Sequence, residues 1–202
     1  MARHIGPQCK RCRSMGEKLF LKGDKCFTDA CVFPKRVGKA TGRPKKLSHY
    51  SLQLKEKQKL KAIYGLLEKQ FRLTFDRARK KNPADRLMVS LERRLDNTIF
   101  RLGFADSRVQ ARQIIRHGHI LVNDKKVNIP SYEVNANQTI AVKDKKGQAL
   151  VKKVLTDKEP AVADWLKLDI DNMIGTVLRL PTREDVKDIP VNTQLIVELY
   201  SK

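Results

Sequence analysis

The chain has 202 residues, with 43 Lys and Arg against 22 Asp and Glu, and a formal net charge of +21. A compact protein with this charge repels itself unless a polyanion neutralises it, so nucleic acid is the expected partner. An anionic membrane would favour a concentrated basic face opposite a strongly apolar one, whereas the basic residues here are spread over three quarters of the chain. Aromatic residues make up only 6%, which argues against a single-strand binder that stacks many bases.

The charge changes sign towards the C-terminus. Residues 154–202 carry six basic and nine acidic side chains, so the preceding residues carry the whole positive balance. We expect this last quarter to complete a core or to face protein, and not to lie against phosphate. Apolar stretches are too short for a transmembrane helix, and residues 1–7 lack the apolar run of a signal peptide. The expected location is therefore the cytosol or an equivalent reducing compartment.

All four cysteines lie within the first 31 residues, as Cys9-x2-Cys12 and Cys26-x4-Cys31. Two close pairs separated by a loop suit tetrahedral thiolate ligation. Neighbouring cations favour the deprotonated thiols, and they are Lys10, Arg11, Arg13 and Lys25. The basic segment 1–46 is therefore predicted to fold around a structural zinc ion. An iron–sulfur cluster is the minor alternative, and two disulfides or four unrelated thiols are the others.

Residues 47–92 are predicted to be the first part of a helical domain. Ser51 can cap a helix that runs to Ile63, where Tyr64-Gly65 interrupts it. A second helix follows, and one of its faces carries the apolar residues Leu67, Phe71, Phe75 and Ala78. Lysines alternate along the first helix at positions 55, 57, 59 and 61. Solubility and phosphate contact explain that alternation equally well.

Asn82-Pro83 is a strong helix start, and the sequence predicts one long helix from there to Gly103. Its apolar line is Leu87, Leu91, Leu95, Ile99 and Leu102.

Ser107 then begins a second helix through Arg116, and Gly118 ends it. On this helix Arg108, Arg112 and Arg116 fall within about 80° of each other. The apolar residues of the same helix occupy a neighbouring arc, and they are Ala111, Ile114 and Ile115. One side is thus predicted to pack and the other to present three guanidinium groups.

The hydrophobic period then changes to two. Residues 120–122 and 127–129 flank a turn and predict a hairpin, residues 132–134 and 139–142 predict two more short strands, and 143–146 a basic turn. We interpret 93–155 as an RNA-binding module of two helices and a small antiparallel sheet. Residues 156–202 are predicted to return and complete the helical domain, with a helix at 161–168 and strands at 176–180 and 194–200. The predicted fold class is α+β.

The chemistry of this module suits structured RNA. Spaced Arg and Lys bind phosphates by releasing counterions, and the helix start at Ser107 adds backbone donors. A duplex RNA is recognised mainly through shape, phosphates and 2′-hydroxyls, which needs few aromatic residues. In an average protein such an arginine face is more often simply solvated, but the net charge reverses those odds.

His117 and His119 could be metal ligands, but a third ligand is missing nearby, so helix capping or RNA contact is favoured.

These residues resemble the small-subunit ribosomal protein S four family of bacteria and plastids (universal small-subunit protein four). The resemblance rests on Arg94-Leu95-Asp96, the runs 101–105, 107–108, 111–113 and 117–132, the stretch 48–72, and the end 195–202. The four cysteines resemble those of the zinc-bearing branch. Residues 37–44 keep Gly, Pro and positive charge but lack the Pro-Gly-Gln-His-Gly run usual in the family.

The resemblance implies a structural constituent of the small ribosomal subunit, and not an enzyme. Members bind the 5′ domain of small-subunit rRNA, nucleate assembly of the body, and lie near neighbouring ribosomal proteins where mRNA enters. There they influence decoding accuracy, and some repress their own mRNA; neither membrane nor DNA is an expected partner. Charge pattern and resemblance together predict RNA contact by Arg36, Lys45, Tyr50, Gln53, Lys55, Lys57, Lys59, Arg72, Arg94, Ser107, Arg108, Arg112, Arg116, His117, His119, Lys125, Lys126, Ser131 and Tyr132.

Two other functions compete with this reading. An RNA-modifying enzyme or a fragment of an aminoacyl-tRNA synthetase could carry a similar module, but it needs a nucleophile or general base in a pocket, and the sequence offers no convergent catalytic set. A zinc-containing DNA-binding regulator would need a recognition helix in a dimer or repeated fingers, and the sequence offers neither.

Overall fold

The computed structural model describes residues 4–33, 48–157 and 161–201. The chain divides into two compact units, one of Met1–Leu87 with Ile189–Lys202 and the other of Met88–Asp188. Among the described residues, no helix combines the length and the apolar character needed to cross a bilayer.

The N-terminal part of the first unit is built from two short helices, α1 (Gln8–Met15) and η1 (Gly23–Cys26). Helix α1 ends at Gly16, whose φ of 68° is the left-handed conformation that glycine adopts without strain. Three cysteines and two leucines of this segment are buried, namely Cys12, Leu19, Leu21, Cys26 and Cys31. These five residues form only a small core.

Two longer helices follow, α3 (His49–Ile63) and α4 (Glu68–Ala78). The predicted cap was wrong by three residues, because Ser48, and not Ser51, accepts the capping hydrogen bond at 3.2 Å from the Ser51 amide. The predicted interruption is confirmed, since Gly65 has a φ of 65°. The predicted apolar face of α4 is also confirmed, with Phe71, Phe75 and Ala78 buried.

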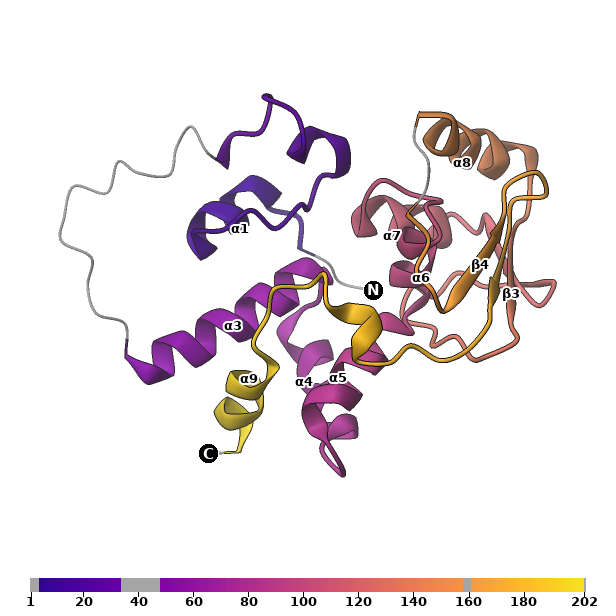
Figure 1. Ribbon diagram of the computed structural model, residues 1–202. Helices are drawn as coiled ribbons and strands as arrows, with labels where there is room; N and C mark the ends of the chain where they lie inside the picture. The colour runs from indigo at the N-terminus through magenta and orange to yellow at the C-terminus, as the bar shows by residue number, and fades with distance from the viewer. Residues whose placement is uncertain (1–3, 34–47, 158–160, 202) are drawn as a thin grey trace. The chain divides into compact units, whose positions relative to one another are not determined.

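The C-terminal residues form helix α9 (Thr193–Tyr200), which lies beside α3 (Figure 1). The prediction of a strand at 194–200 was therefore wrong. Asn192 caps the helix through a 3.1 Å bond from the Gln194 amide, and Tyr200 stacks on Phe75 with ring centroids 4.4 Å apart. These tertiary contacts outweigh the β propensity of a Leu-Ile-Val run.

Glu68 ties α3, α4 and α9 together. Its carboxylate accepts hydrogen bonds from Lys57 at 2.7 Å and Lys61 at 2.8 Å, and the Tyr200 hydroxyl lies 3.3 Å away. Burial by itself raises the pKa of Glu68, but the two lysines outweigh it and lower the pKa to about 2. The folded state therefore binds this proton more weakly than the unfolded chain does.

We expect Glu68→Gln to remove a pH-dependent part of the stability. A carboxylate with a lowered pKa stabilises the fold above its unfolded value of 4.5, and the effect disappears as the pH falls towards about 2. The loss should be about 1 kcal/mol or less at neutral pH, because the side chain is half exposed. Urea unfolding at a series of pH values measures it, with Asp76→Asn, an exposed carboxylate of α4, as the matched control. A wild-type–variant difference that stays constant from pH 7 to pH 2 would contradict the assignment.

The second unit contains helices α6 (Leu95–Arg101), α7 (Arg108–Arg116) and α8 (Lys145–Asp157), and α5 (Pro83–Glu92) leads into it. The predicted single helix from 83 to 102 was wrong, because the chain breaks at Arg94, which has an extended backbone. There Arg94 forms an isolated β-bridge with Glu133, and the Leu95 amide donates to the Tyr132 carbonyl at 2.8 Å. Backbone pairing with a distant segment thus replaces one helical turn.

Helix α7 begins and ends where the sequence predicts. The Ser107 hydroxyl accepts a hydrogen bond from the Gln110 amide at 3.3 Å, and Gly118 has a φ of 78°. Both ends of the helix are determined by local residues, so they can be predicted without knowing how the rest of the unit packs.

The sheet has five antiparallel strands in the order β2-β1-β3-β5-β4. The strands are β1 (Ile120–Val122), β2 (Lys125–Lys126), β3 (Thr139–Val142), β4 (Leu166–Asp169) and β5 (Ile174–Val177). The predicted hairpin exists, but its turn is only Asn123-Asp124, with φ of 46° and 61°. Positive φ at both central residues is the geometry of a tight two-residue hairpin, so the second strand is 125–126 and not 127–129. Residues 132–134 contribute the bridge at Glu133 in place of the predicted strand.

The end of this unit also differs from the prediction. Residues 161–168 were predicted to be helical, but they lead into β4, and the predicted basic turn at 143–146 runs into α8. Trp165, Leu166 and Val177 are buried in one core with Leu95 and Leu102. Gly175 permits this packing, because a Cβ there would collide with the Leu102 side chain. The second unit therefore extends to Asp188 and not to 155.

Candidate RNA-binding surface and cysteine cluster

The first predicted RNA contacts form a buried ion-pair cluster. The Asp96 carboxylate accepts hydrogen bonds from Arg94 at 3.0 and 2.7 Å and from Arg112 at 3.2 Å. Asp96 is 3% exposed and Arg112 is 7% exposed. The prediction that α7 presents three guanidinium groups was therefore wrong, because α6 places a carboxylate where Arg112 points.

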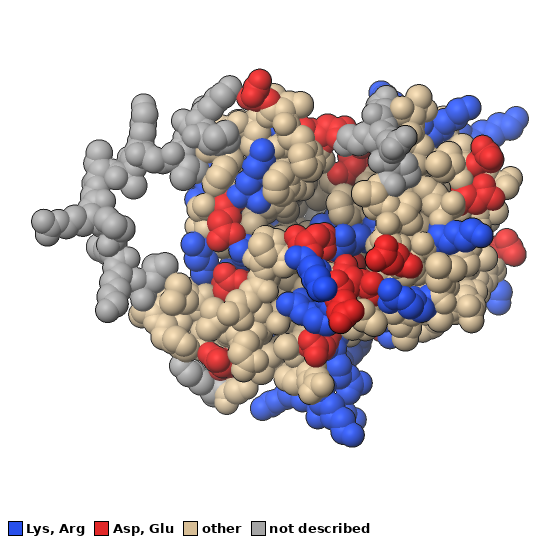
Figure 2. Space-filling view, viewed as in Figure 1, with Lys and Arg blue, Asp and Glu red and all other residues tan. Residues whose placement is uncertain are grey.

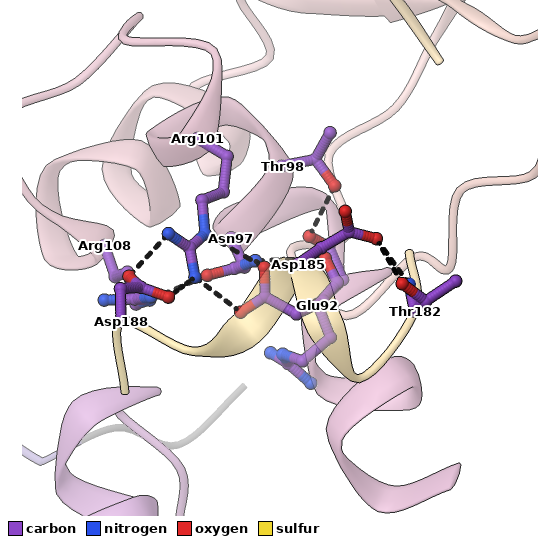
Figure 3. A network of polar contacts seen from close by, with 9 residues as sticks. Glu92, Asn97, Thr98, Arg101, Arg108, Thr182, Asp185 and Asp188 are labelled. Carbon is purple, nitrogen blue, oxygen red and sulfur yellow. Dashed lines mark hydrogen bonds and ion pairs between the residues drawn. The ribbon is translucent and has the colours of Figure 1, made fainter. Parts of the chain in front are cut away.

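Arg108 is held in place by its neighbours. Its Nε donates to Asn97 Oδ1 at 2.8 Å, and its guanidinium lies 4.5 Å from the centre of the Phe100 ring. Asn97 in turn donates to the Glu92 carboxylate at 2.9 Å. Arg108 is half-buried, so a positively charged group is fixed close to the surface by this network (Figure 3).

Glu92 is the centre of that network. Arg101 donates to it at 2.9 and 3.1 Å and to Asp188 at 2.7 and 2.9 Å (Figure 3). Burial by itself lowers the pKa of Arg101, but the two carboxylates raise it above its ordinary value. Asp188, the last residue of the unit, is thereby fastened to α6.

Some of the exposed basic side chains of this unit lie at the end of α7 and on the β1–β2 hairpin. Arg116, His117, Lys125 and Lys126 are all exposed. The Lys126 side chain passes directly over Gly118, where a Cβ would collide with it. The hairpin and the helix end therefore form one basic surface, which we call the hairpin patch: Arg116, His117, Lys125 and Lys126.

His119 lies beside this patch but is engaged inside the protein. Its Nδ1 is 2.9 Å from the Asp144 carboxylate, and Asp144 also accepts the Gly147 amide at 2.7 Å. The Gly147 hydrogen bond and the His119 ring together lower the pKa of Asp144. Asp144 thus accepts a hydrogen bond from a backbone amide in the first turn of α8. The sequence did not predict this role, because Asp144 lies within a run of lysines.

Ser131 and Tyr132 are half-buried. The Tyr132 hydroxyl accepts from Gln138 Nε2 at 3.1 Å, and the Tyr132 carbonyl accepts the Leu95 amide. This segment holds the start of α6 in position.

The residues predicted in the first unit separate into two groups. Gln53 is fully buried and donates to Glu198 at 3.1 Å, Lys59 is buried against Glu17, and Lys57 is paired with Glu68. Tyr50 and Arg72 are exposed, and Lys55 is half-buried. Arg36 and Lys45 lie outside the described residues.

One exposed basic cluster was missed by the sequence reasoning. Arg79, Lys80 and Lys81 follow α4, Arg86 is in the first turns of α5, and all four are exposed. Lys and Arg side chains gather at this corner in Figure 2. The signal was visible as the basic run 77–81, but RNA contact was predicted for no residue between Arg72 and Arg94.

The four cysteines line one small cavity, together with Leu21 and Lys22. None of them forms a disulfide, and the Lys22 amide donates to Cys26 Sγ at 3.4 Å. Burial raises the pKa of Cys12, and the charges of the other three thiols raise it further, against one backbone hydrogen bond that lowers it. Within the described residues, no three His, Cys, Asp or Glu side chains lie in a ligand arrangement. The four thiols therefore line one cavity without forming a three-residue ligand group in the part of the chain that the structure describes.

Comparisons with known proteins agree with this architecture. Residues 93–140 match the S4 domain, and residues 3–95 match the ribosomal protein S4/S9 N-terminal domain. The small ribosomal subunit proteins uS4 of Clostridium tetani and Desulfotalea psychrophila are each 49% identical to this chain, and that of Thermosipho melanesiensis is 48% identical. Each comparison covers 100% of both chains. The chain belongs to the ribosomal protein S4 family.

Proposed function

We propose that this protein is a structural, non-enzymatic constituent of the bacterial small ribosomal subunit that binds rRNA in the cytoplasm. The full-length similarity to proteins named small ribosomal subunit protein uS4 carries this conclusion. The charge of +21 supports it, because rRNA supplies the polyanion that such a chain requires.

We infer that the hairpin patch, together with Arg108 at the opposite end of α7, meets the phosphates of a folded RNA. A network that immobilises Arg108 before binding lowers the entropy lost on contact. The 5′ domain of the rRNA is the proposed target, and early binding there would nucleate assembly of the body. The acidic last quarter faces neighbouring small-subunit proteins, close to where mRNA enters, and through them the chain would affect decoding accuracy. Repression of its own mRNA by the same surface is a further proposal.

Incorporation into subunits tests this function. The tagged protein, expressed in a bacterium, should sediment with small subunits and remain bound after a moderate salt wash. A protein that stays at the top of the gradient, with all small subunits lacking it, would overturn the proposal.

We also propose that Cys9, Cys12, Cys26 and Cys31 bind a structural zinc ion. The donor set fits, because the four thiols face one cavity and four thiolates form a closed tetrahedral site. Burial first, and then the charges of the other three thiols, raise the pKa of Cys12, and a bound dication would favour its thiolate instead. An iron–sulfur cluster is the minor alternative on the same ligands.

Removing the metal should loosen residues 4–33 and spare the second unit. Chelation, or Cys12→Ser, removes the link between segments that have little core of their own. Hydrogen exchange followed by mass spectrometry measures both regions in one sample, and metal analysis identifies the ion. Equal protection of residues 4–33 before and after chelation would contradict the zinc site, and visible absorption with bound iron would select the cluster.

A further inference from the structure

Two aromatic rings of the cysteine-bearing segment stack on each other at the surface. Phe20 is 47% exposed and Phe27 is 70% exposed, and their ring centroids are 4.9 Å apart with 27° between the planes. Exposed apolar surface of this kind commonly marks a contact site. The hairpin patch and the proposed zinc site make no use of these rings.

The fold holds Phe20 in this position at a cost. Leu19 and Leu21 on either side are buried, whereas the ring of Phe20 between them is exposed. Phe20 also has a φ of 49°, which is a rare and strained conformation for a bulky residue. Strained residues gather at functional sites, because the surrounding structure must compensate for them.

Phe27 is fixed from the other side. It follows Cys26, at the end of η1, and its amide donates to the Asp24 carbonyl at 2.8 Å. Cys26 is buried in the cavity that the four thiols share. The position of the second ring is therefore set by the cysteine cluster.

One lysine lies beside the pair, and two more lie within two residues of its rings in the sequence. Lys18 Nζ lies 5.3 Å from the centre of the Phe20 ring, and Lys22 and Lys25 are exposed. Aromatic faces next to lysines suit a nucleotide, because the base stacks on a ring while the phosphate meets a cation. An apolar protein partner would instead leave these ammonium groups to be desolvated without compensation.

We propose that Phe20 and Phe27 form a stacking platform for an unpaired base of the rRNA, with Lys18 beside the adjoining phosphate. This inference rests on the proposed function and adds a contact of a different chemical kind to it. The hairpin patch binds through charge, whereas the platform binds through an aromatic face that is indifferent to charge.

The experiment compares full-length variants bound to a transcript of the 5′ domain of small-subunit rRNA. Phe20→Leu with Phe27→Leu keeps the apolar bulk and removes both rings, so affinity should fall by about tenfold. The slope of log affinity against log salt should stay unchanged, because stacking releases no counterions. Phe20→Tyr with Phe27→Tyr keeps the rings and should restore wild-type affinity. Leu73→Ala removes an exposed apolar residue of α4 and serves as the control.

Photocrosslinking at short ultraviolet wavelength gives a second reading. A base stacked on either ring should crosslink to the peptide that contains residues 18–27, as identified by mass spectrometry. Wild-type affinity of the leucine variant, or an equal loss in the tyrosine variant, would overturn the platform while leaving rRNA binding intact. If the wild-type protein itself fails to bind the transcript, the proposed function fails with it.

Discussion

Replacing Asp96 with alanine is expected to destabilise the second unit by about 3–5 kcal/mol, because it leaves two buried guanidinium groups without their carboxylate. Arg94 and Arg112 both donate to Asp96, and all three residues are buried. Urea unfolding followed by tryptophan fluorescence measures this loss. Trp165 is the one tryptophan of the chain and is fully buried in this unit, so its signal reports the unit directly.

Asp188→Ala is the matched control for that experiment. Asp188 also pairs with an arginine, but its carboxylate is exposed, so its removal should cost only about 0–1 kcal/mol. Equal losses from Asp96→Ala and Asp188→Ala would show that burial of the Asp96 cluster does not determine its contribution.

The same cluster changes what a substitution of Arg112 can report. Charge reversal by Arg112→Glu would place a second carboxylate beside Asp96 in a buried site, so the variant is expected to unfold the unit. Any loss of RNA binding would then follow from the loss of the fold. Exposed residues are the correct probes of the RNA contact.

The largest expected effect on RNA binding comes from the β1–β2 hairpin. Reversing two charges, with Lys125→Glu and Lys126→Glu, should weaken binding to the 5′-domain transcript by about a hundredfold at low salt. The salt dependence should also decrease, with a slope lower by about 2, because two phosphate contacts no longer release counterions. Filter binding at several salt concentrations measures both quantities.

Lys167→Glu with Lys187→Glu makes the same change in net charge within the same unit. Both lysines are exposed, but they lie in the acidic last quarter of the chain. This control should lose only the small, uniform part of the affinity that follows net charge. Identical losses in the two double variants would mean that net charge alone governs binding and that the hairpin patch is no specific contact.

The sequence predicted elements whose signals are local. Ser107 and Gly118 bound α7, and the hairpin after Ile120 forms because Asn123 and Asp124 tolerate positive φ. The apolar face of α4 follows from helical spacing alone. The family resemblance, carried by short runs along the whole chain, was confirmed by the comparisons.

The failures share a different cause. The break at Arg94 has no glycine or proline, and it arises because Arg94 pairs with Glu133 and Leu95 with Tyr132, far along the chain. Helix α9 was mistaken for a strand because its helical state depends on packing against α3 and α4. Strands β4 and β5 belong to the second unit because β5 pairs with β3. The hydrophobic pattern of β5 does not indicate which strand it pairs with.

The site residues show the same division. A helical projection groups Arg108, Arg112 and Arg116. It cannot show that Arg112 donates a hydrogen bond to Asp96, which lies on another helix. Likewise Lys59 and Gln53 carry the polar character of surface residues and are buried by partners far along the chain. Burial by tertiary partners, and not residue type, decides which cations remain available for RNA.

The most direct test is the affinity of the wild-type protein for a folded 5′-domain rRNA transcript, measured across a range of salt concentrations. Tight binding at low salt, with log affinity falling linearly and steeply against log salt, is the predicted result. Absence of binding at low salt, or an affinity that added salt leaves unchanged, would contradict the conclusion that this chain recognises ribosomal RNA through its exposed cations.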